Sequence, residues 1–135
     1  MFDTIVIGAG IIGCATARAL SLYDLNVCVL EAQSDLAEGT TKANSAIVHA
    51  GYDAKPGTDK ARYNVRGNAL YHVLSRELDV PFVENGSLVL CEEESQIQEL
   101  EALKARGEQN GVPGLSIVRG EALRAMEPHL HENIV

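Results

Sequence analysis

The sequence predicts an α/β protein that opens with a parallel βαβ unit. Two short runs rich in β-branched and other apolar residues, Thr4 to Gly8 and Asn26 to Ala32, suit buried parallel strands. Between them, Ile11 to Ser21 has helical character and carries small residues that let a helix lie close to a sheet. Strand, glycine turn, helix and strand follow within about 30 residues, as in a right-handed crossover unit.

The middle of the chain predicts a long loop and then a long helix. Residues Gln33 to Gly57 are rich in turn formers and show no long period, so we expect mostly loop, with Ala46 to Ala50 as a short ordered piece. Apolar residues recur near helical spacing from Asp59 to Leu78, and Thr58 is a suitable N-cap. The sequence therefore predicts an amphipathic helix directly after the loop.

The last third predicts short elements of mixed type. Asn85-Gly86 lies between two β-rich runs and predicts a hairpin over Pro81 to Cys91. A polar helix is expected from Ser95 to Asn110, a strand from Leu115 to Val118, and a short helix in "GEALRAMEP" that ends before Pro128.

The pattern changes near Asp79, and we place a domain boundary near Val80. Residues 1–80 would form one domain, and residues 81–135 would begin a second, α+β one. About 55 residues with a hairpin and one more strand are too few for an independent core. We therefore expect the chain to be the N-terminal portion of a longer protein and to be inactive alone.

Composition excludes several classes of function. A net charge of −8 and the lack of a basic stripe disfavour binding to nucleic acid or to an anionic membrane. Cys14, Cys28 and Cys91 lie in apolar runs without metal-ligand spacing, so no metal is expected. The N-terminus lacks signal-peptide features, and no run approaches the ~18 apolar residues of a membrane span. We expect a cytoplasmic protein.

The residues Gly8-Ala9-Gly10-Ile11-Ile12-Gly13 form the G-x-G-x-x-G pattern. Alone it is a weak signal, because tight strand-to-helix turns are often rich in glycine. Here it follows a predicted strand and opens a predicted helix, where backbone N–H groups and the helix dipole favour a diphosphate. Glu31 ends the second strand, 18 residues after Gly13, where a carboxylate can bind an adenosine ribose. The alternative for Glu31 is a solvated carboxylate at the end of a strand.

The fingerprint does not decide between NAD and FAD. The long loop after the second strand offers hydroxyl and amide groups, from Thr40 to Ser45, to a second part of an extended cofactor. Lys42 could contact a phosphate there or be only a solvated charge. Arg62 and Arg66 more simply form a solvated helix face than an anion site.

Four stretches together resemble a known family: "IVIGAGIIGCATARAL", "LEA", "GTTKANSAIVHAGYDAKPGT" and "VPFVENGSLVLCEE". They are similar to the N-terminal part of FAD-dependent oxidoreductases related to D-amino-acid oxidase. Within that superfamily the resemblance is closest to the glycerol-3-phosphate dehydrogenase and L-2-hydroxyglutarate dehydrogenase group. It implies a Rossmann-like FAD-binding domain of the glutathione-reductase type, joined to a substrate domain whose sheet begins with "GSLVL".

The resemblance also implies which residues contact the cofactor. The glycines would face the FAD diphosphate, and Glu31 would face the adenosine ribose. Residues 40–45 would line the diphosphate and the flavin edge. Ile47, Val48 and His49 would lie beside the isoalloxazine. The full set is Gly8, Gly10, Ile11, Ile12, Gly13, Glu31, Ala32, Thr40, Thr41, Lys42, Ala43, Asn44, Ser45, Ile47, Val48 and His49. The alternative for His49 is a partly buried histidine bonded to backbone groups. No catalytic residue is assigned.

The activity that the resemblance implies is hydride transfer from a small hydroxy compound, glycerol 3-phosphate or a 2-hydroxy acid, to flavin N5. Electrons would then pass to a quinone, oxygen or a carrier protein. Two alternatives stay open: an amine or amino-acid oxidase of the same superfamily, and a nucleotide-binding fragment without catalysis. Exposed sheet edges would also allow the chain to associate with itself.

Overall fold

The computed structural model describes all residues from Met1 to Val135. Contacts within the chain divide it into two compact units, Met1–Ile47 and Val48–Val135. These units are defined by contacts between residues of this chain and do not test where the domains of a longer protein would meet. The domain boundary near Val80 therefore stays a prediction. None of the helices combines the length and hydropathy needed to span a membrane.

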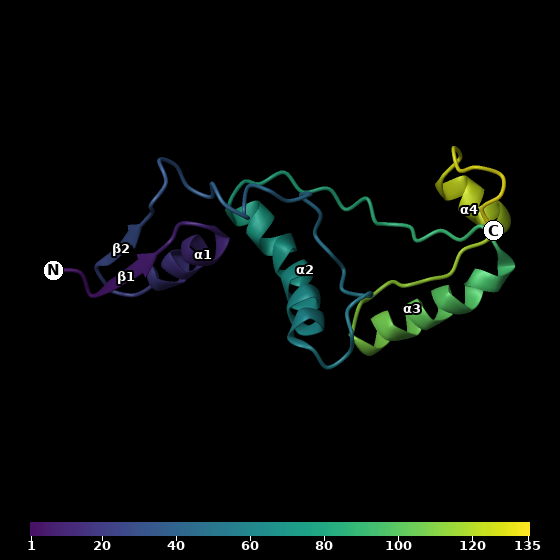
Figure 1. Cartoon of the computed structure of the whole chain (residues 1–135), viewed down its shortest axis with the longest axis horizontal. Helices are drawn as coiled ribbons and strands as arrows, with labels where there is room; N and C mark the ends of the chain where they lie inside the picture. The colour runs from purple at the N-terminus through teal and green to yellow at the C-terminus, as the bar shows by residue number, and fades with distance from the viewer. The chain divides into compact units, whose positions relative to one another are not determined.

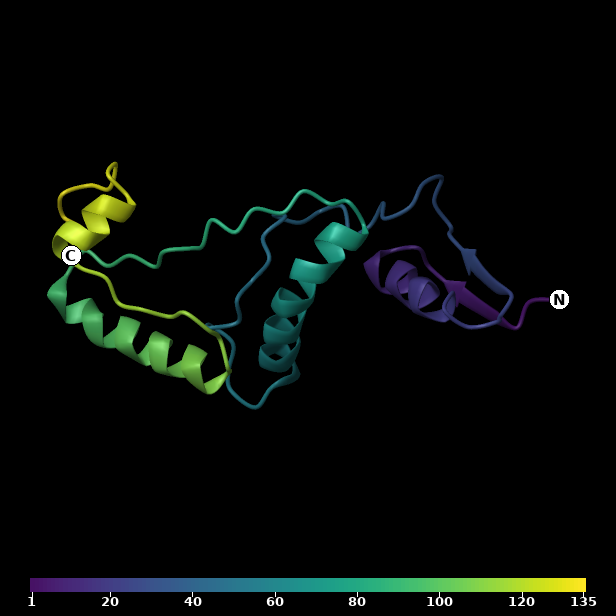
Figure 2. The same cartoon turned by 180° about the vertical axis from the view of Figure 1, so that it is seen from behind.

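The first unit is the predicted βαβ unit. Strand β1 (Thr4–Ile7) pairs in parallel with β2 (Val27–Leu30), and α1 (Ile11–Leu20) connects them. In Figures 1 and 2 the two strands lie side by side with α1 alongside them. Two residue pairs illustrate the register, since Ile5 is opposite Cys28 and Ile7 is opposite Leu30. The strand, turn and helix order predicted from the sequence is thus confirmed.

One face of this sheet has no cover within the unit. Successive side chains of a strand point to opposite faces, so Ile5 and Ile7 share one face. They are 53% and 86% exposed, and Leu30, opposite Ile7, is also exposed. Val6 faces the other way, toward α1, since a Cβ added at Gly13 would lie 3.4 Å from Val6 Cγ1. The expectation that both faces of these strands are buried is therefore wrong for this chain, because only one helix packs on a sheet of two strands.

The second unit is helical. Its long helix α2 (Asp59–Glu77) begins at Thr58, whose hydroxyl accepts from the N–H of Ala61 as predicted. A 3₁₀ turn, η1 (Glu94–Gln96), leads into α3 (Ile97–Gln109), and α4 (Gly120–Met126) follows near the C-terminus. The predicted helices agree with these bounds to within one or two residues. Buried apolar residues of this unit are Ala54, Ala61, Cys91, Ile97, Val112 and Leu123.

The predicted hairpin over Pro81 to Cys91 and the predicted strand at Leu115 to Val118 are wrong for this chain. Neither segment is in a strand, and the extended ribbon after α2 carries no arrow in Figure 1. Gly86 does adopt the positive φ (72°) that a turn at Asn85-Gly86 requires. The arms beside it do not pair, and Val83 is 76% exposed. A two-stranded hairpin is marginal without a third strand or a packed face, and these segments have neither.

Candidate cofactor site

The glycine-rich turn between β1 and α1 is tight enough to require glycine. Gly8 has φ of +96°, in the region that side chains disfavour. At Gly13 an added Cβ would lie 1.9 Å from the carbonyl oxygen of Gly8, a backbone atom that cannot move aside. The first turn of α1 therefore approaches the end of β1 as closely as backbone allows, which is the role of the third glycine in a dinucleotide fingerprint.

Two N–H groups of this turn are held by side chains from later in the chain. The N–H of Ala9, which is fully buried, donates to Glu31 Oε2 at 2.7 Å. The N–H of Ile11, the first residue of α1, donates to Thr41 Oγ1 at 3.0 Å. Gly10, the N-cap, offers no side chain for this purpose, so Thr41 takes that part. A carboxylate and a hydroxyl thus lie at the positively polarised end of α1.

Glu31 is fixed at the end of β2 by backbone donors on both oxygens. Its Oε1 accepts from the N–H of Gln33 at 2.9 Å, and its Oε2 from Ala9. These bonds, with that of Gln33 the largest cause, hold the pKa of Glu31 below its ordinary value. The side chain is therefore a carboxylate at neutral pH, a group that can accept hydrogen bonds from the hydroxyls of a ribose and would repel a second phosphate by its charge.

The loop after β2 is folded by its own polar side chains. Asn44 donates through Nδ2 to the carbonyl of Thr41 and accepts at Oδ1 from the N–H of Ala46, which has φ of +54°. Lys42 is paired with Glu38 at 2.8 Å and stays 67% exposed. The remaining predicted contacts of this loop and of α1 lie exposed in the same unit: Ile11, Ile12, Ala32, Thr40, Ala43, Ser45 and Ile47.

Val48 and His49 belong to the second unit. Residues 45–50 are in neither helix nor strand, so the short piece expected at Ala46 to Ala50 has no regular secondary structure. The carbonyl of His49 accepts a hydrogen bond from Asn68 Nδ2 at 3.4 Å, and its side chain is exposed. The bond to α2 concerns the backbone of His49, and its imidazole takes no part in it.

Sequence reasoning missed Ala9, Asn68 and Asn110. Ala9 is a variable position of the fingerprint, yet its N–H donates to the carboxylate of Glu31 and its carbonyl accepts from the N–H of Ala37 at 3.1 Å. Its signal lay in its place between the two glycines of a strand-to-helix turn, and the structure buries it fully. The two asparagines act on distant backbone, for which the sequence holds no local signal.

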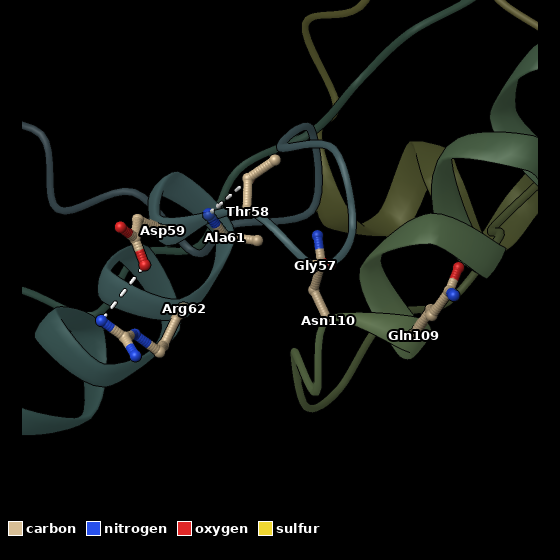
Figure 3. Close-up of a pocket in the computed structure, with 7 residues that line it drawn as sticks. All are labelled: Gly57, Thr58, Asp59, Ala61, Arg62, Gln109 and Asn110. Atoms are coloured by element: carbon tan, nitrogen blue, oxygen red, sulfur yellow. Dashed lines mark hydrogen bonds and ion pairs between the residues drawn. The ribbon is translucent and has the colours of Figure 1, made fainter.

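A separate hollow of about 350 Å³ lies in the second unit between the start of α2 and the end of α3 (Figure 3). The dashed lines in the figure mark the Thr58 cap and the Asp59–Arg62 ion pair, 3.1 Å long. Arg62 also lies over the ring of Tyr63. Its charge is thus already matched, and none of the predicted cofactor residues lines the hollow.

The fold and the turn together define a dinucleotide-binding βαβ protein. The residues fit a diphosphate and its ribose: Gly13 has no room for a side chain, the N-terminus of α1 faces the turn, and an ionised carboxylate, Glu31, directly follows β2. The model of the FAD dependent oxidoreductase family (DAO) matches residues 3–135. The chain belongs to this family, whose cofactor is FAD.

Relatives with known activities support the same family. The chain is 52% identical over 134 residues to glycerol 3-phosphate dehydrogenase of Caloramator mitchellensis. The alignment covers 99% of this chain and 28% of that protein. It is 38% identical over 130 residues to human mitochondrial L-2-hydroxyglutarate dehydrogenase, covering 95% of the chain and 28% of that protein. The chain therefore spans about 28% of the length of these curated relatives.

A solved structure confirms the Rossmann-like FAD-binding fold. The structure of dithionite-reduced L-α-glycerophosphate oxidase from Mycoplasma pneumoniae with FAD bound is similar at a TM-score of 0.81 and 31% identity. The similarity covers 99% of this chain and 36% of that one. The backbone that carries the glycine turn thus follows the path found in a protein that holds FAD.

Proposed function

We propose that this chain is the FAD-binding part of a flavin-dependent dehydrogenase or oxidase that acts on a small hydroxy compound, glycerol 3-phosphate or a 2-hydroxy acid. The observation that carries the proposal is the turn at Gly13, which is closed to any side chain, within a chain matched almost end to end by an FAD-dependent family. The relatives named above act on glycerol 3-phosphate or L-2-hydroxyglutarate according to their names.

In this proposal the chain's residues bind and orient the cofactor. N–H groups at the start of α1 hold the diphosphate, and Glu31 accepts from the ribose hydroxyls. The loop from Thr40 to Ile47 lies along the diphosphate and flavin edge, with Val48 and His49 beside the ring. When bound, FAD supplies the hydride acceptor, flavin N5, for the carbon that carries the hydroxyl.

The remaining features stay proposals of the same kind. Residues 81–135 would begin an α+β substrate domain, and the FAD domain would be of the glutathione-reductase type. The acceptor of the electrons would be a quinone, oxygen or a carrier protein. A cytoplasmic location agrees with three free cysteines, Cys14, Cys28 and Cys91.

The test uses the complete gene product, mixed with FAD and freed of unbound flavin. We expect about one flavin per polypeptide, and bleaching of the flavin band under anaerobic conditions by glycerol 3-phosphate or by L-2-hydroxyglutarate. A D- or L-amino acid or an amine that bleaches the band in their place would support the oxidase alternative. A colourless protein that binds NAD would refute the proposal.

Two substitutions test the cofactor contacts. Asn44→Ala opens the loop that its side chain folds, and His49→Ala removes the proposed neighbour of the flavin ring. We expect weaker FAD retention or a changed flavin spectrum in both. Unchanged flavin content and spectrum in both variants would remove the loop and His49 from the site.

A further inference from the structure

The backbone segment Gly51 to Ala54 is held at both ends by one side chain. Asn110, the C-cap of α3, donates through Nδ2 to the carbonyl of Gly51 at 2.9 Å and to that of Ala54 at 2.8 Å. Gly51 is buried and Ala54 is 2% exposed. Because buried carbonyls need partners, the two hydrogens of one amide satisfy both ends of this segment at once.

Close backbone packing on both sides leaves the segment little freedom. Gly51 has φ of +101°, and a Cβ on it would lie 3.1 Å from both Asn64 Cβ and Val65 Cγ2 of α2. On the other side, a Cβ on Gly107 of α3 would lie 2.8 Å from Tyr52 Cβ. The segment is thus fitted between α2 and the last turn of α3, and Asn110 closes the fit.

This segment begins two residues after His49. The chain around His49 forms no helix or strand. Asn68 of α2 donates a hydrogen bond to the carbonyl of His49 at 3.4 Å. An irregular stretch of backbone takes its position from the fixed points at its ends. The nearest firm point on the C-terminal side of His49 is the carbonyl of Gly51, to which Asn110 donates.

We propose that Asn110 is a positioning residue that sets the place of His49, and through it the environment of the flavin, by holding the Gly51–Ala54 segment against the end of α3. The inference rests on the proposed function, which puts His49 beside the flavin ring. Asn110 itself touches no cofactor in this scheme. It acts across 59 residues of sequence through backbone carbonyls alone.

Two adjacent residues of α3 and its C-cap provide a matched experiment. Asn110→Asp keeps the shape of the side chain and removes both donors, because a carboxylate only accepts. Gln109→Glu makes the same change of charge one residue earlier, at an exposed position that also lines the hollow of Figure 3. Asn110→Gln keeps the amide but displaces it by one methylene.

The variants are compared in the FAD-loaded complete gene product by flavin absorption and circular dichroism, and by chemical unfolding. For Asn110→Asp we expect a lower unfolding midpoint, because the carbonyls of Gly51 and Ala54 lose their donor, and a shifted flavin spectrum. Asn110→Gln should shift the spectrum less, and Gln109→Glu should leave both measurements as in the parent.

A parent protein that binds no FAD would refute the proposed function, and this inference with it. An FAD-loaded Asn110→Asp protein with a lower unfolding midpoint but the parent's flavin spectrum would refute the inference alone, since Asn110 would then be purely structural. A parent-like unfolding midpoint in that variant would also refute it. If Asn110→Asp does not fold, Asn110→Gln decides: an unshifted spectrum there would overturn the assignment.

Discussion

The glycine turn of the first unit and the Gly51–Ala54 segment of the second are both tight passages of backbone, but they are held over different distances in the sequence. The turn is closed by Gly8 and Gly13, five residues apart. The segment is closed by Gly107 and Asn110, more than fifty residues away. The first arrangement follows from a local pattern, and the second follows only from how α3 packs.

Gly13→Ala should break the local arrangement, and we expect the largest effect from it. The new methyl would meet the backbone oxygen of Gly8, so α1 must move away from the end of β1. We expect a loss of stability of about 3 kcal/mol, at the upper end for overpacking, and at least about a tenfold loss of FAD affinity. Denaturant unfolding and flavin titration measure the two.

Gly39→Ala is the control for this change. Gly39 lies in the loop after β2, and a Cβ on it meets nothing within 4 Å. Its stability should stay within about 0.5 kcal/mol of the parent, as for other surface substitutions. If Gly13→Ala behaved like Gly39→Ala, the turn would not be closed by the contact described.

Gly107→Ala should break the long-range arrangement. Its methyl would lie 2.4 Å from Leu115 Cδ1, which can rotate, but also 2.8 Å from Tyr52 Cβ, which is tied to the backbone. We expect a loss of about 1–3 kcal/mol of stability. Gly67→Ala in α2 is the opposite control, because that Cβ meets nothing and alanine favours a helix by about 1 kcal/mol. In chemical denaturation the free energy of unfolding should be highest for Gly67→Ala, intermediate for the parent and lowest for Gly107→Ala.

The difference between the two passages explains what the sequence could predict. Gly8 to Gly13 and Glu31 lie in one local unit whose order dictates its geometry, so strands, helix and turn were predicted correctly. Thr58 was predicted as a cap because capping is also local. The pairing of residues 81–91 depends on partners elsewhere in space, and the Asn85-Gly86 pattern alone does not supply them. Asn110 could not be predicted for the same reason, since its two acceptors are distant in sequence.

Arg124 bonds acceptors at an intermediate separation in the sequence, six to ten residues away. Its guanidinium donates to the carbonyls of Leu130, His131, Glu132 and Ile134, from 2.8 to 3.1 Å. Arg124→Lys cannot reproduce this, because an ammonium has three donors without the planar fork. We expect a loss of about 1–2 kcal/mol in thermal or chemical unfolding.

Arg119→Lys is the control for that change. Arg119 is half exposed and lies 3.7 Å from Glu94, so its ion pair contributes little. Its loss of stability should stay below about 0.5 kcal/mol. Equal effects of the two substitutions would mean that the four carbonyl contacts do not order the C-terminal segment.

Glu31 accepts hydrogen bonds from the N–H groups of Ala9, in the glycine turn, and of Gln33, after β2. Its replacement should change stability least among these substitutions, because the carboxylate is open to water. The backbone N–H groups of Gln33 and Ala9 hold its pKa below the ordinary value of 4.5. A group whose pKa is lower in the folded state contributes stability above its unfolded pKa, and that contribution is lost as pH falls through the folded pKa. The parent should therefore lose more stability than Glu31→Gln between about pH 5 and about pH 3.

The measurement is chemical unfolding across that range, with Glu101→Gln on the exposed side of α3 as the control. Asp3 and Asp53 also have lowered pKa values, from the bonds of Asn26 and Lys60 respectively, so all proteins should keep part of the slope. A Glu31→Gln protein that retains the full slope would show that its carboxylate does not hold Ala9. The turn would then be closed by Gly8 and Gly13 alone.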